Sequence, residues 1–310
     1  MFQLFDTFRE QLALSNDELS SYLHTIPFRY KRFYIDKRNS DEKRLIAQPA
    51  KAVKTLQRYA ISEIEDELPI HSSAMAYCKG RGIKENALVH AKSRYLLKLD
   101  LKNFFESISP EILLSVISKH SIELCDNDKF LISNLFFWKL RRNSHLKLSV
   151  GAPSSPFISN VIMYFFDKDL AEKCNEMNVS YTRYADDMTF STQDSNILYK
   201  IETIVRKLLK FHFDNKLTIN RSKTVHSSKA HNRHVTGVTL DNHGRISLGR
   251  DNKRSLRSGV YNFTQGRLNK DEAMKLRGKL GFAKYIEPKF ILRLEKTFGK
   301  DVIDELKKYN

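Results

Sequence analysis

The sequence predicts an α+β protein that ends in a basic, helical region, and three patterns support this class. Tyr95–Leu101 alternates as a strand does, with Leu97, Leu99 and Leu101 on one face. Tyr181–Ser191 has two strand-like halves around a short turn. From about residue 250 onward, helical spacing combines with an excess of Lys and Arg. A mixed core followed by a helical lobe is therefore expected.

The first part of the chain predicts helices around a hairpin. Residues 1–23 have helical spacing, and Ser15 to Glu18 has the sequence of a capping box. The basic, aromatic stretch Phe28–Ile46 predicts a hairpin that turns near residues 38–41. A further helix is expected from about residue 50 to residue 67, because prolines flank it on both sides.

The middle of the chain alternates between helices and strands. Helical patterns cover residues 110–119, 126–142, 155–177 and 195–213. A second hairpin is predicted from Val235–Leu240 and Arg245–Leu248, because residues 241–244 between them have the composition of a loop.

Three helices are expected at the end of the chain, at about 250–265, 270–286 and 288–308. Asn269 suits the N-cap of the second helix, and Pro288 suits the first turn of the third. These cues predict a small helical bundle.

Positive charge is concentrated in this last part of the chain. The 310 residues contain 53 Lys and Arg against 36 Asp and Glu, a formal charge of +17. Residues 221–310 carry +12 of this charge. A basic region attached to a near-neutral body predicts a polyanionic partner, with nucleic acid favoured over an anionic membrane and a solvated surface as the alternative.

Composition excludes several other classes of protein. Apolar residues at 41%, with 20 Phe and 13 Tyr, are incompatible with a disordered chain. The longest apolar run, Val161–Phe166, is too short to cross a bilayer, and the first ten residues are not those of a secretory signal. Cys78, Cys125 and Cys174 have neither disulfide nor zinc spacing, so a reducing cytoplasm is expected.

Asp186 and Asp187 are the most informative pair of residues. Neighbours on a regular strand point to opposite faces, so both carboxylates reach one site only if a tight turn redirects one of them. Adjacent acids repel each other unless a cation lies between them, and such oxygen ligands suit Mg²⁺. An isolated pair usually only solvates a turn. Asp100, however, ends an apolar strand, and three acids on two strands could hold two Mg²⁺ ions for phosphoryl transfer.

Three ordered strings make the sequence resemble a reverse transcriptase. Leu99–Phe105 (LDLKNFF) is similar to the first catalytic motif of the palm, and Gly151–Pro156 with Asn160 is similar to the second. Tyr184–Asp187 (YADD) is similar to the third. The resemblance covers essentially the whole chain. It implies a right-hand polymerase with fingers, a palm made of an antiparallel sheet and helices, and a helical thumb.

The same resemblance implies a division into domains. The N-terminal helix and fingers would cover residues 1–94, and the palm 95–234, with a fingers insertion at about 115–150. The primer-grip hairpin and the basic thumb would cover residues 235–310.

Two shorter signatures resemble those of bacterial retron reverse transcriptases. Asn86–His90 (NALVH) matches the retron NAxxH signature, and Val235–Gly237 matches the retron VTG signature. Retron enzymes copy their cognate structured non-coding RNA into branched msDNA, primed from the 2′-hydroxyl of a guanosine. The resemblance thus implies three kinds of partner: the cognate non-coding RNA, its msDNA product and dNTPs. It also implies phage defence with a separate toxin-type or ATPase-type effector, RNA removal by a host RNase H, and no membrane partner.

The resemblance assigns roles to individual residues. The implied ligands of two Mg²⁺ ions are Asp100, Asp186, Asp187 and the carbonyl of Leu101. The implied dNTP contacts are Lys43, Arg44, Gly151 and Phe105, which stands at the steric-gate position. Lys223 would protonate the leaving pyrophosphate. The implied RNA or DNA contacts are Asn86, His90, Val235, Thr236, Gly237, Arg250, Lys253, Arg254 and Arg257.

Several of these assignments keep an alternative. Arg221 lies close enough to replace Lys223, and either Phe104 or Phe105 belongs to the core. Asn86 and His90 share one helical face and could serve the core instead of RNA. The rival functions are another small bacterial reverse transcriptase, intron-derived or diversity-generating, and an RNA-binding scaffold of a toxin or effector complex.

Overall fold

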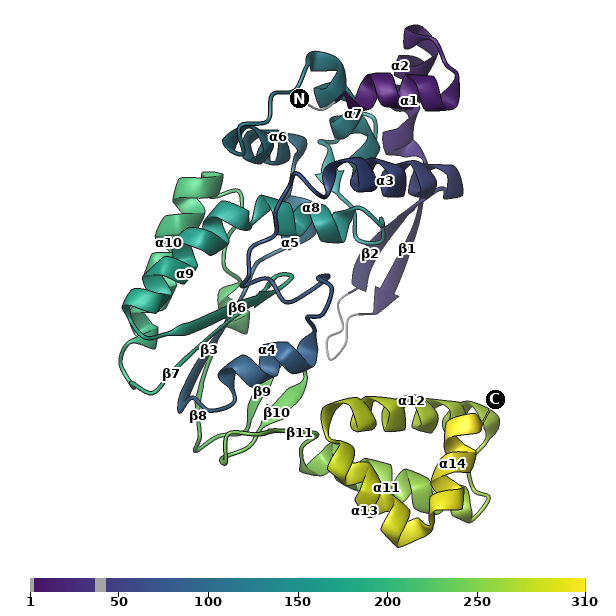
Figure 1. Cartoon of the computed structure of the whole chain (residues 1–310), viewed down its shortest axis with the longest axis vertical. Coiled ribbons are helices and arrows are strands. Elements are labelled where there is room, and N and C mark those ends of the chain that lie inside the picture. The colour runs from purple at the N-terminus through teal and green to yellow at the C-terminus, as the bar shows by residue number, and fades with distance from the viewer. Residues whose placement is uncertain (1–2, 37–42, 310) are drawn as a thin grey trace. The chain divides into compact units, whose positions relative to one another are not determined.

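The computed structural model describes residues 3–36 and 43–309 (Figure 1). Its α-helices are α1 (Leu4–Leu12), α2 (Asn16–Thr25), α3 (Lys51–Ile64), α4 (Ile83–His90), α5 (Phe104–Ser107), α6 (Pro110–Lys119), α7 (Asp126–Phe136), α8 (Ser155–Ile162), α9 (Tyr164–Glu176), α10 (Leu198–Phe213), α11 (Arg250–Thr264), α12 (Lys270–Ile286), α13 (Pro288–Phe298) and α14 (Lys300–Lys308). Short 3-10 helices, η1 and η2, cover Ile26–Phe28 and Arg221–Lys223.

The strands are β1 (Tyr30–Asp36), β2 (Lys43–Pro49), β3 (Tyr95–Asp100), β4 (Phe137–Trp138), β5 (Lys147–Leu148), β6 (Ser180–Tyr184), β7 (Asp187–Thr192), β8 (Val225–Ser228), β9 (Arg233–Val235), β10 (Val238–Leu240) and β11 (Ile246–Ser247). A four-stranded sheet has the order β6-β7-β3-β8, and a three-stranded sheet the order β11-β10-β9. Strands β1 and β2 pair with each other, as do β4 and β5. The predicted mixture of helices and sheets is present.

The chain divides into two compact units, each built from separate stretches of sequence. The first comprises Met1–Cys78, Lys98–Met188 and Tyr199–Val225. The second comprises Lys79–Leu97, Thr189–Leu198 and His226–Asn310. None of the described helices is both long and apolar enough to cross a membrane.

The N-terminal hairpin and capping box of the first unit are confirmed. Strands β1 and β2 pair antiparallel from Tyr30↔Pro49 to Asp36↔Lys43, and the predicted turn at residues 38–41 lies outside the described residues. The Ser15 hydroxyl accepts a hydrogen bond from the Glu18 amide, and the Glu18 carboxylate accepts one from the Ser15 amide. The helix expected over residues 1–23 is in fact two helices, because Ala13 adopts a left-handed conformation with φ of 50°.

Two helices of the first unit are shorter than predicted. The pattern over residues 126–142 ends as a helix at Phe136, because Phe137–Trp138 pairs as a strand with Lys147–Leu148. The pattern over 155–177 is interrupted at Met163 and forms α8 and α9. Helices α9 and α10 lie side by side, where the rings of Phe166 and Phe213 are 6.0 Å apart (Figure 1).

The second unit packs α4 and the small sheet with four C-terminal helices around a core of its own. The hairpin predicted from Val235–Leu240 and Arg245–Leu248 is confirmed in its pairing, since β10 and β11 pair antiparallel on either side of residues 241–244. Its first strand is shorter than predicted, because a turn at Thr236-Gly237, with φ of 46° and 81°, makes β9 and β10 pair antiparallel as well. Positive φ at both turn residues matches the twist of a tight hairpin. The helix expected over 288–308 is broken at Gly299, whose φ is 95°. The shared core includes Ala87, Val235, Leu240, Leu256, Leu280 and Phe290.

Candidate active site

A cavity of about 1020 Å³ in the first unit collects most of the residues predicted for catalysis and nucleotide binding. Its lining comes from β2, α3, the end of β3, α5, the start of α8, the turn between β6 and β7, and η2. The predicted residues that line it are Lys43, Arg44, Asp100, Leu101, Phe105, Gly151, Asp186 and Lys223. Residues from five distant stretches of sequence therefore meet at one site.

Backbone hydrogen bonds hold the acidic side of this cavity. Ala185 and Asp186 form the two-residue turn between β6 and β7, and Ala185 has φ of 56°. The Leu101 amide donates to the Asp186 carbonyl at 3.0 Å, and the Asn220 amide donates to the Asp100 carbonyl at 2.7 Å. The two acids and the stretch before η2 are thus fixed to one another through the main chain.

Two acids on this side of the cavity repel each other, and a lysine partly neutralises them. Burial, followed by the charge of Asp100, raises the pKa of Asp186 above its ordinary value. The Lys223 Nζ lies 2.8 Å from Asp100 Oδ2, and this hydrogen bond raises the pKa of the ammonium group. Because the Lys223 side chain is 57% exposed, this contact lies at the open edge of the site. The acids attract a cation, and a protein ammonium partly meets that demand.

Asp187 lies apart from the cavity lining. It is the first residue of β7 and is exposed, since the turn has already placed Asp186 on the cavity side. Although the residue is exposed at the surface, neighbouring protein atoms partly desolvate its carboxyl, and this desolvation together with the charges of Asp186 and Asp100 raises its pKa to about 6. The three acids therefore share one electrostatic environment, although two of them line the cavity.

The donor set suits a hard divalent cation. Among residues 3–36 and 43–309, no group of three or more His, Cys, Asp or Glu is arranged to hold a metal ion. Mg²⁺, however, is usually held by one or two carboxylates plus substrate phosphates, rather than by a cage made of protein alone. Asp100 and Asp186, whose charges repel each other, fit that kind of open site.

Another part of the cavity lining is basic. Lys43 and Arg44 lie on β2, and Lys54 and Arg58 lie on α3. Arginine offers paired donors that match phosphate oxygens, and lysine adds a point charge. These basic residues can bind a polyphosphate in the same cavity as the acids.

Gly151 is required by its contact with β2. Its φ is 122°, and a Cβ there would lie 3.1 Å from Ile46 Cγ2 and 3.3 Å from the Ala47 carbonyl oxygen. The Ala47 amide donates to the Val150 carbonyl at 3.0 Å. The glycine therefore lets the 150–152 loop pack against the strand that carries Arg44, a protein contact in addition to the dNTP contact expected of this residue.

The two neighbouring phenylalanines differ in burial. Both line the cavity, but Phe104 is buried in the core while Phe105 is half-buried. Their ring centroids are 5.4 Å apart in an edge-to-face arrangement. Phe105 is thus braced by Phe104 and presents a bulky ring to whatever occupies the cavity.

Tyr77 was not predicted from the sequence. It lines the cavity, its side chain is 53% exposed and its φ is 60°. Burial, followed by the negative charge of Asp186, raises the pKa of its phenol. Left-handed conformations of non-glycine residues are uncommon and are concentrated at functional sites, but no local pattern in the sequence predicts this one.

The two short signatures meet in the second unit. Asn86 and His90, on α4, are both 0% exposed. The His90 Nδ1 lies 2.8 Å from the Ser191 hydroxyl, and burial lowers the pKa of His90 to about 3. The Asn86 amide nitrogen donates to the Thr236 hydroxyl at 3.4 Å. The direct RNA contact expected for these two side chains is therefore corrected to the alternative, a role in the core.

The predicted basic stripe is only partly available to a partner. Arg250, Arg254 and Arg257 are exposed on α11, and Arg257 lies over the Phe290 ring at 5.6 Å. Lys253 is 22% exposed and pairs with Glu287 at 2.8 Å, so it is committed to the bundle. Glu287 is 34 positions away in sequence, which is why spacing alone placed Lys253 with the others.

Comparisons with known proteins agree with this geometry. Residues 35–240 match the family described as reverse transcriptase (RNA-dependent DNA polymerase). The chain is 46% identical over 283 residues to the retron Ec83 reverse transcriptase of Escherichia coli, covering 91% of this chain and 90% of that protein. It is 28% identical over 302 residues to the Escherichia coli retron Ec86 reverse transcriptase, covering 95% and 90%.

Among solved structures, the chain is similar to an apo telomerase from Candida tropicalis, with a TM-score of 0.50 and 13% identity. The alignment covers 87% of this chain and 59% of that one, so the chain spans about three fifths of the telomerase length. At this identity the likeness shows the fold alone. Together with the family match, it confirms the predicted fold class, including its palm-like antiparallel sheet.

Proposed function

Because the chain belongs to the reverse transcriptase family, and within it to the retron reverse transcriptases, it is an RNA-directed DNA polymerase, and we propose that it copies a cognate structured non-coding RNA into branched msDNA. DNA synthesis would start from the 2′-hydroxyl of a guanosine in that RNA. The observation that carries the proposal is the cavity, whose lining brings the carboxylates of Asp100 and Asp186 together with basic residues. This arrangement suits phosphoryl transfer to a nucleoside triphosphate.

The residues of the cavity divide the work of this reaction. Lys43 and Arg44 bind and orient the triphosphate of the incoming dNTP, and the ring of Phe105 excludes a ribose 2′-hydroxyl. Asp100, Asp186 and Asp187, with the Leu101 carbonyl, would hold two Mg²⁺ ions. Bound Mg²⁺ lowers the pKa of the attacking hydroxyl and neutralises charge on the phosphates.

Lys223 is favoured over Arg221 as the group that serves the leaving pyrophosphate. Lys223 lines the cavity, with its ammonium 2.8 Å from the Asp100 carboxylate. The cavity lining includes Asn220, Ser222 and Lys223. An ammonium at this edge can stabilise charge on the departing group and donate a proton to it.

The second unit supplies the proposed contacts to RNA and to the growing duplex. The region Val235–Leu248, which includes Thr236 and Gly237, would serve as primer grip, although the Val235 side chain is itself buried in the core and is corrected from a direct contact to a packing role. Helix α11 would face the phosphates with Arg250, Arg254 and Arg257. An A-form duplex presents backbone and 2′-hydroxyl groups, so a rigid basic helix suits it. In this proposal, fingers, palm and thumb occupy residues 1–94, 95–234 and 235–310, with a fingers insertion at about 115–150.

Neutralising α11 tests its contact with RNA. Arg250→Gln with Arg254→Gln should weaken RNA binding and reduce the magnitude of the slope of log affinity against log salt by roughly one to two. The reason is that fewer phosphates are neutralised on binding, so fewer counterions are released. Filter binding between low and moderate salt measures this slope. Lys253→Gln is the matched control: it should change the slope little, because Lys253 is paired with Glu287. Equal effects of both variants would count against the proposed face.

The pH dependence of metal binding follows from Asp187. Its pKa is raised to about 6 in the metal-free fold, which means that the fold favours the protonated carboxyl. The contribution of this protonated group to folding stability is fully present below its ordinary pKa of 3.8 and is lost as pH rises through about 6. A bound cation needs the carboxylate, so Mn²⁺ affinity should weaken roughly tenfold per pH unit below about pH 6. Electron paramagnetic resonance of free Mn²⁺ measures this affinity. Affinity that stays constant down to pH 4.5 would contradict the assignment of Asp187.

The proposed function is tested by the structure of the product. The purified chain is incubated with dNTPs, Mg²⁺ and the folded RNA transcribed from the DNA that flanks its gene. The proposal expects DNA joined to RNA through a 2′,5′ linkage, resistant to release until a debranching enzyme is added. Linear cDNA with a free 5′ end would favour an intron-derived or diversity-generating enzyme. RNA binding with no extension at all would favour the scaffold alternative.

The wider setting is part of the same proposal. Phage defence with a separate toxin-type or ATPase-type effector, RNA removal by a host RNase H and a cytoplasmic location all rest on the retron relationship. Deleting the gene for this chain in a host that carries the complete locus, and then measuring survival after phage infection, tests the defence role.

A further inference from the structure

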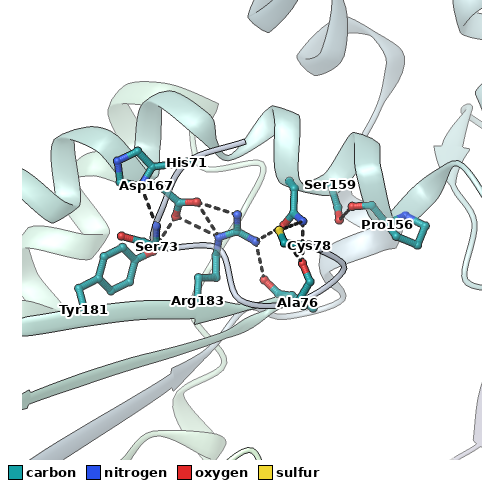
Figure 2. Close-up of polar contacts among 11 residues, drawn as sticks. His71, Ser73, Ala76, Cys78, Pro156, Ser159, Asp167, Tyr181 and Arg183 are labelled. Carbon is teal, nitrogen blue, oxygen red and sulfur yellow. Dashed lines mark hydrogen bonds and ion pairs between the residues drawn. The ribbon is translucent and has the colours of Figure 1, made fainter. Parts of the chain in front are cut away.

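A buried ion pair lies directly beneath the catalytic turn. Arg183 on β6 and Asp167 on α9 are both 0% exposed, and Arg183 Nη2 lies 2.6 Å from Asp167 Oδ2 (Figure 2). The Arg183 Nε donates to both carboxylate oxygens, at 3.0 and 3.1 Å. The Tyr181 hydroxyl donates to Asp167 Oδ1 at 2.7 Å. The carboxylate is therefore saturated, and its guanidinium partner has a fixed orientation.

The remaining nitrogen of the guanidinium reaches the turn itself. Arg183 Nη1 donates to the Ala185 carbonyl at 3.0 Å and to Asn160 Oδ1 at 3.2 Å. Ala185 has φ of 56°, a conformation that L-residues avoid unless their surroundings impose it. The next residue is Asp186, whose carboxylate lines the cavity. One buried side chain thus spans from helix α9 to the peptide that orients a catalytic acid.

The same cluster also anchors the segment that carries Tyr77, a residue of the cavity lining. The Asn160 amide nitrogen donates to the Ala76 carbonyl at 2.9 Å, next to Tyr77. The Arg183 main chain also pairs with this segment, donating to Ser73 and accepting from Met75, both at 2.8 Å. Figure 2 shows the segment from His71 to Cys78 wrapped around the guanidinium. The position of Arg183 is therefore fixed from three sides.

We propose that Arg183 is a positioning residue for catalysis: its guanidinium holds the Ala185-Asp186 turn so that the Asp186 carboxylate faces the site of phosphoryl transfer. This inference rests on the proposed function, because it concerns the same acids. A buried ion pair is weak evidence for a role in stability, since apolar residues of similar volume often stabilise a core as well or better. A role in orientation, by contrast, uses the geometry of the guanidinium fork, which lysine lacks.

Three variants separate positioning from plain stability. Arg183→Lys keeps the charge beside Asp167 but cannot also reach Ala185 and Asn160. The double variant Arg183→Met with Asp167→Leu removes both charges and therefore leaves no unpaired buried ion. It keeps the test possible if the lysine variant fails to fold. Leu170→Ala on α9 is the matched control, because it opens a cavity on the same helix, 0% exposed, without touching the turn.

For each variant, kcat and the KM for dNTP are measured by primer extension, Mn²⁺ affinity by electron paramagnetic resonance, and folding by thermal unfolding. Both Arg183 variants should lower kcat by about 10- to 100-fold, with KM for dNTP changed less than about threefold, since a misplaced acid mainly affects the chemical step. Mn²⁺ should bind several-fold more weakly. Leu170→Ala should lower the melting temperature while kcat and Mn²⁺ affinity stay at wild-type values.

The proposal is overturned if a folded Arg183 variant retains wild-type kcat and Mn²⁺ affinity. It is also overturned if Leu170→Ala loses kcat and Mn²⁺ affinity to the same extent, because the effect would then follow stability alone. A wild-type chain that makes no DNA would instead refute the proposed function. The Mn²⁺ measurement needs no turnover, so the two failures can be told apart.

Discussion

Replacing Asp186 and Asp187 together by Asn should abolish DNA synthesis, with an expected loss in kcat of about a thousandfold or more. An amide carries no charge and is a poor ligand for Mg²⁺, so the acidic side of the cavity loses its hold on the cations that would activate the attacking hydroxyl. RNA binding should stay within about twofold of wild type, because it depends on basic residues elsewhere in the chain. Single-turnover primer extension and filter binding measure the two quantities separately.

The two single variants should differ in effect. Asp186 lines the cavity, whereas Asp187 is exposed at the start of β7. Asp186→Asn should therefore lose more kcat than Asp187→Asn. Asp194→Asn is the control for loss of one negative charge, since Asp194 is exposed and is not among the lining residues. Robust extension by the double variant would refute the assignment of the acids.

Loss of activity in these variants would not reflect unfolding. Burial and mutual repulsion raise the pKa of both Asp186 and Asp187, which means that the metal-free fold disfavours their charged forms. Removing the charges should leave thermal stability unchanged or raise it at pH 7. Such a trade between stability and activity is typical of sites that concentrate like charges for function.

Short-range signals account for the parts of the fold that the sequence predicted well. The capping box at Ser15 and the N-cap at Asn269 form as expected, and Asn269 also completes a capping box with Glu272, because each involves residues three positions apart. The turn at Ala185-Asp186 and helix α6 also follow from local patterns. Where neighbours in sequence decide the conformation, periodicity and turn chemistry were sufficient.

Long-range contacts account for most of the errors. Helix α7 ends at Phe136 because the next residues pair with β5, and Lys253 is taken up by Glu287. The breaks at Ala13 and Thr236 place non-glycine residues at positive φ, which propensity does not predict. Gly299 is different, since a glycine between two helical patterns was an available signal for a helix end.

The candidate site was predicted from motifs more than from periodicity. Asp100, Gly151 and Asp186 lie far apart in sequence, yet the order and content of the motifs were enough to predict that they line one cavity. The Arg183 cluster was not predicted, because its meaning depends on which helix packs against β6. Asn86 and His90 carried a family signature, yet a signature does not say whether a residue faces a ligand or the core.

Phe105→Ala should raise the ratio of rNTP to dNTP incorporation by roughly tenfold to a hundredfold, the second large effect expected of the cavity. Phe105 is half-buried in the lining and is held by Phe104, so its ring cannot easily swing away from an added hydroxyl. Alanine removes that wall and leaves room for the 2′-hydroxyl. Steady-state incorporation of one dNTP or the matching rNTP opposite a template base measures the ratio.

The higher ratio of rNTP to dNTP incorporation in Phe105→Ala should come from the loss of the clash with the 2′-hydroxyl, and not from weaker binding of the triphosphate. The value of kcat/KM for dNTP should therefore fall only a few-fold, while kcat/KM for rNTP rises. Arg44→Gln is the matched contrast: it lies on β2, among the basic residues of the lining, and should lower both kcat/KM values together because both substrates carry the same triphosphate. An unchanged ratio for Phe105→Ala would exclude the ring as a gate. The half-exposed ring of Tyr77 would then be the next aromatic group in the cavity lining to test.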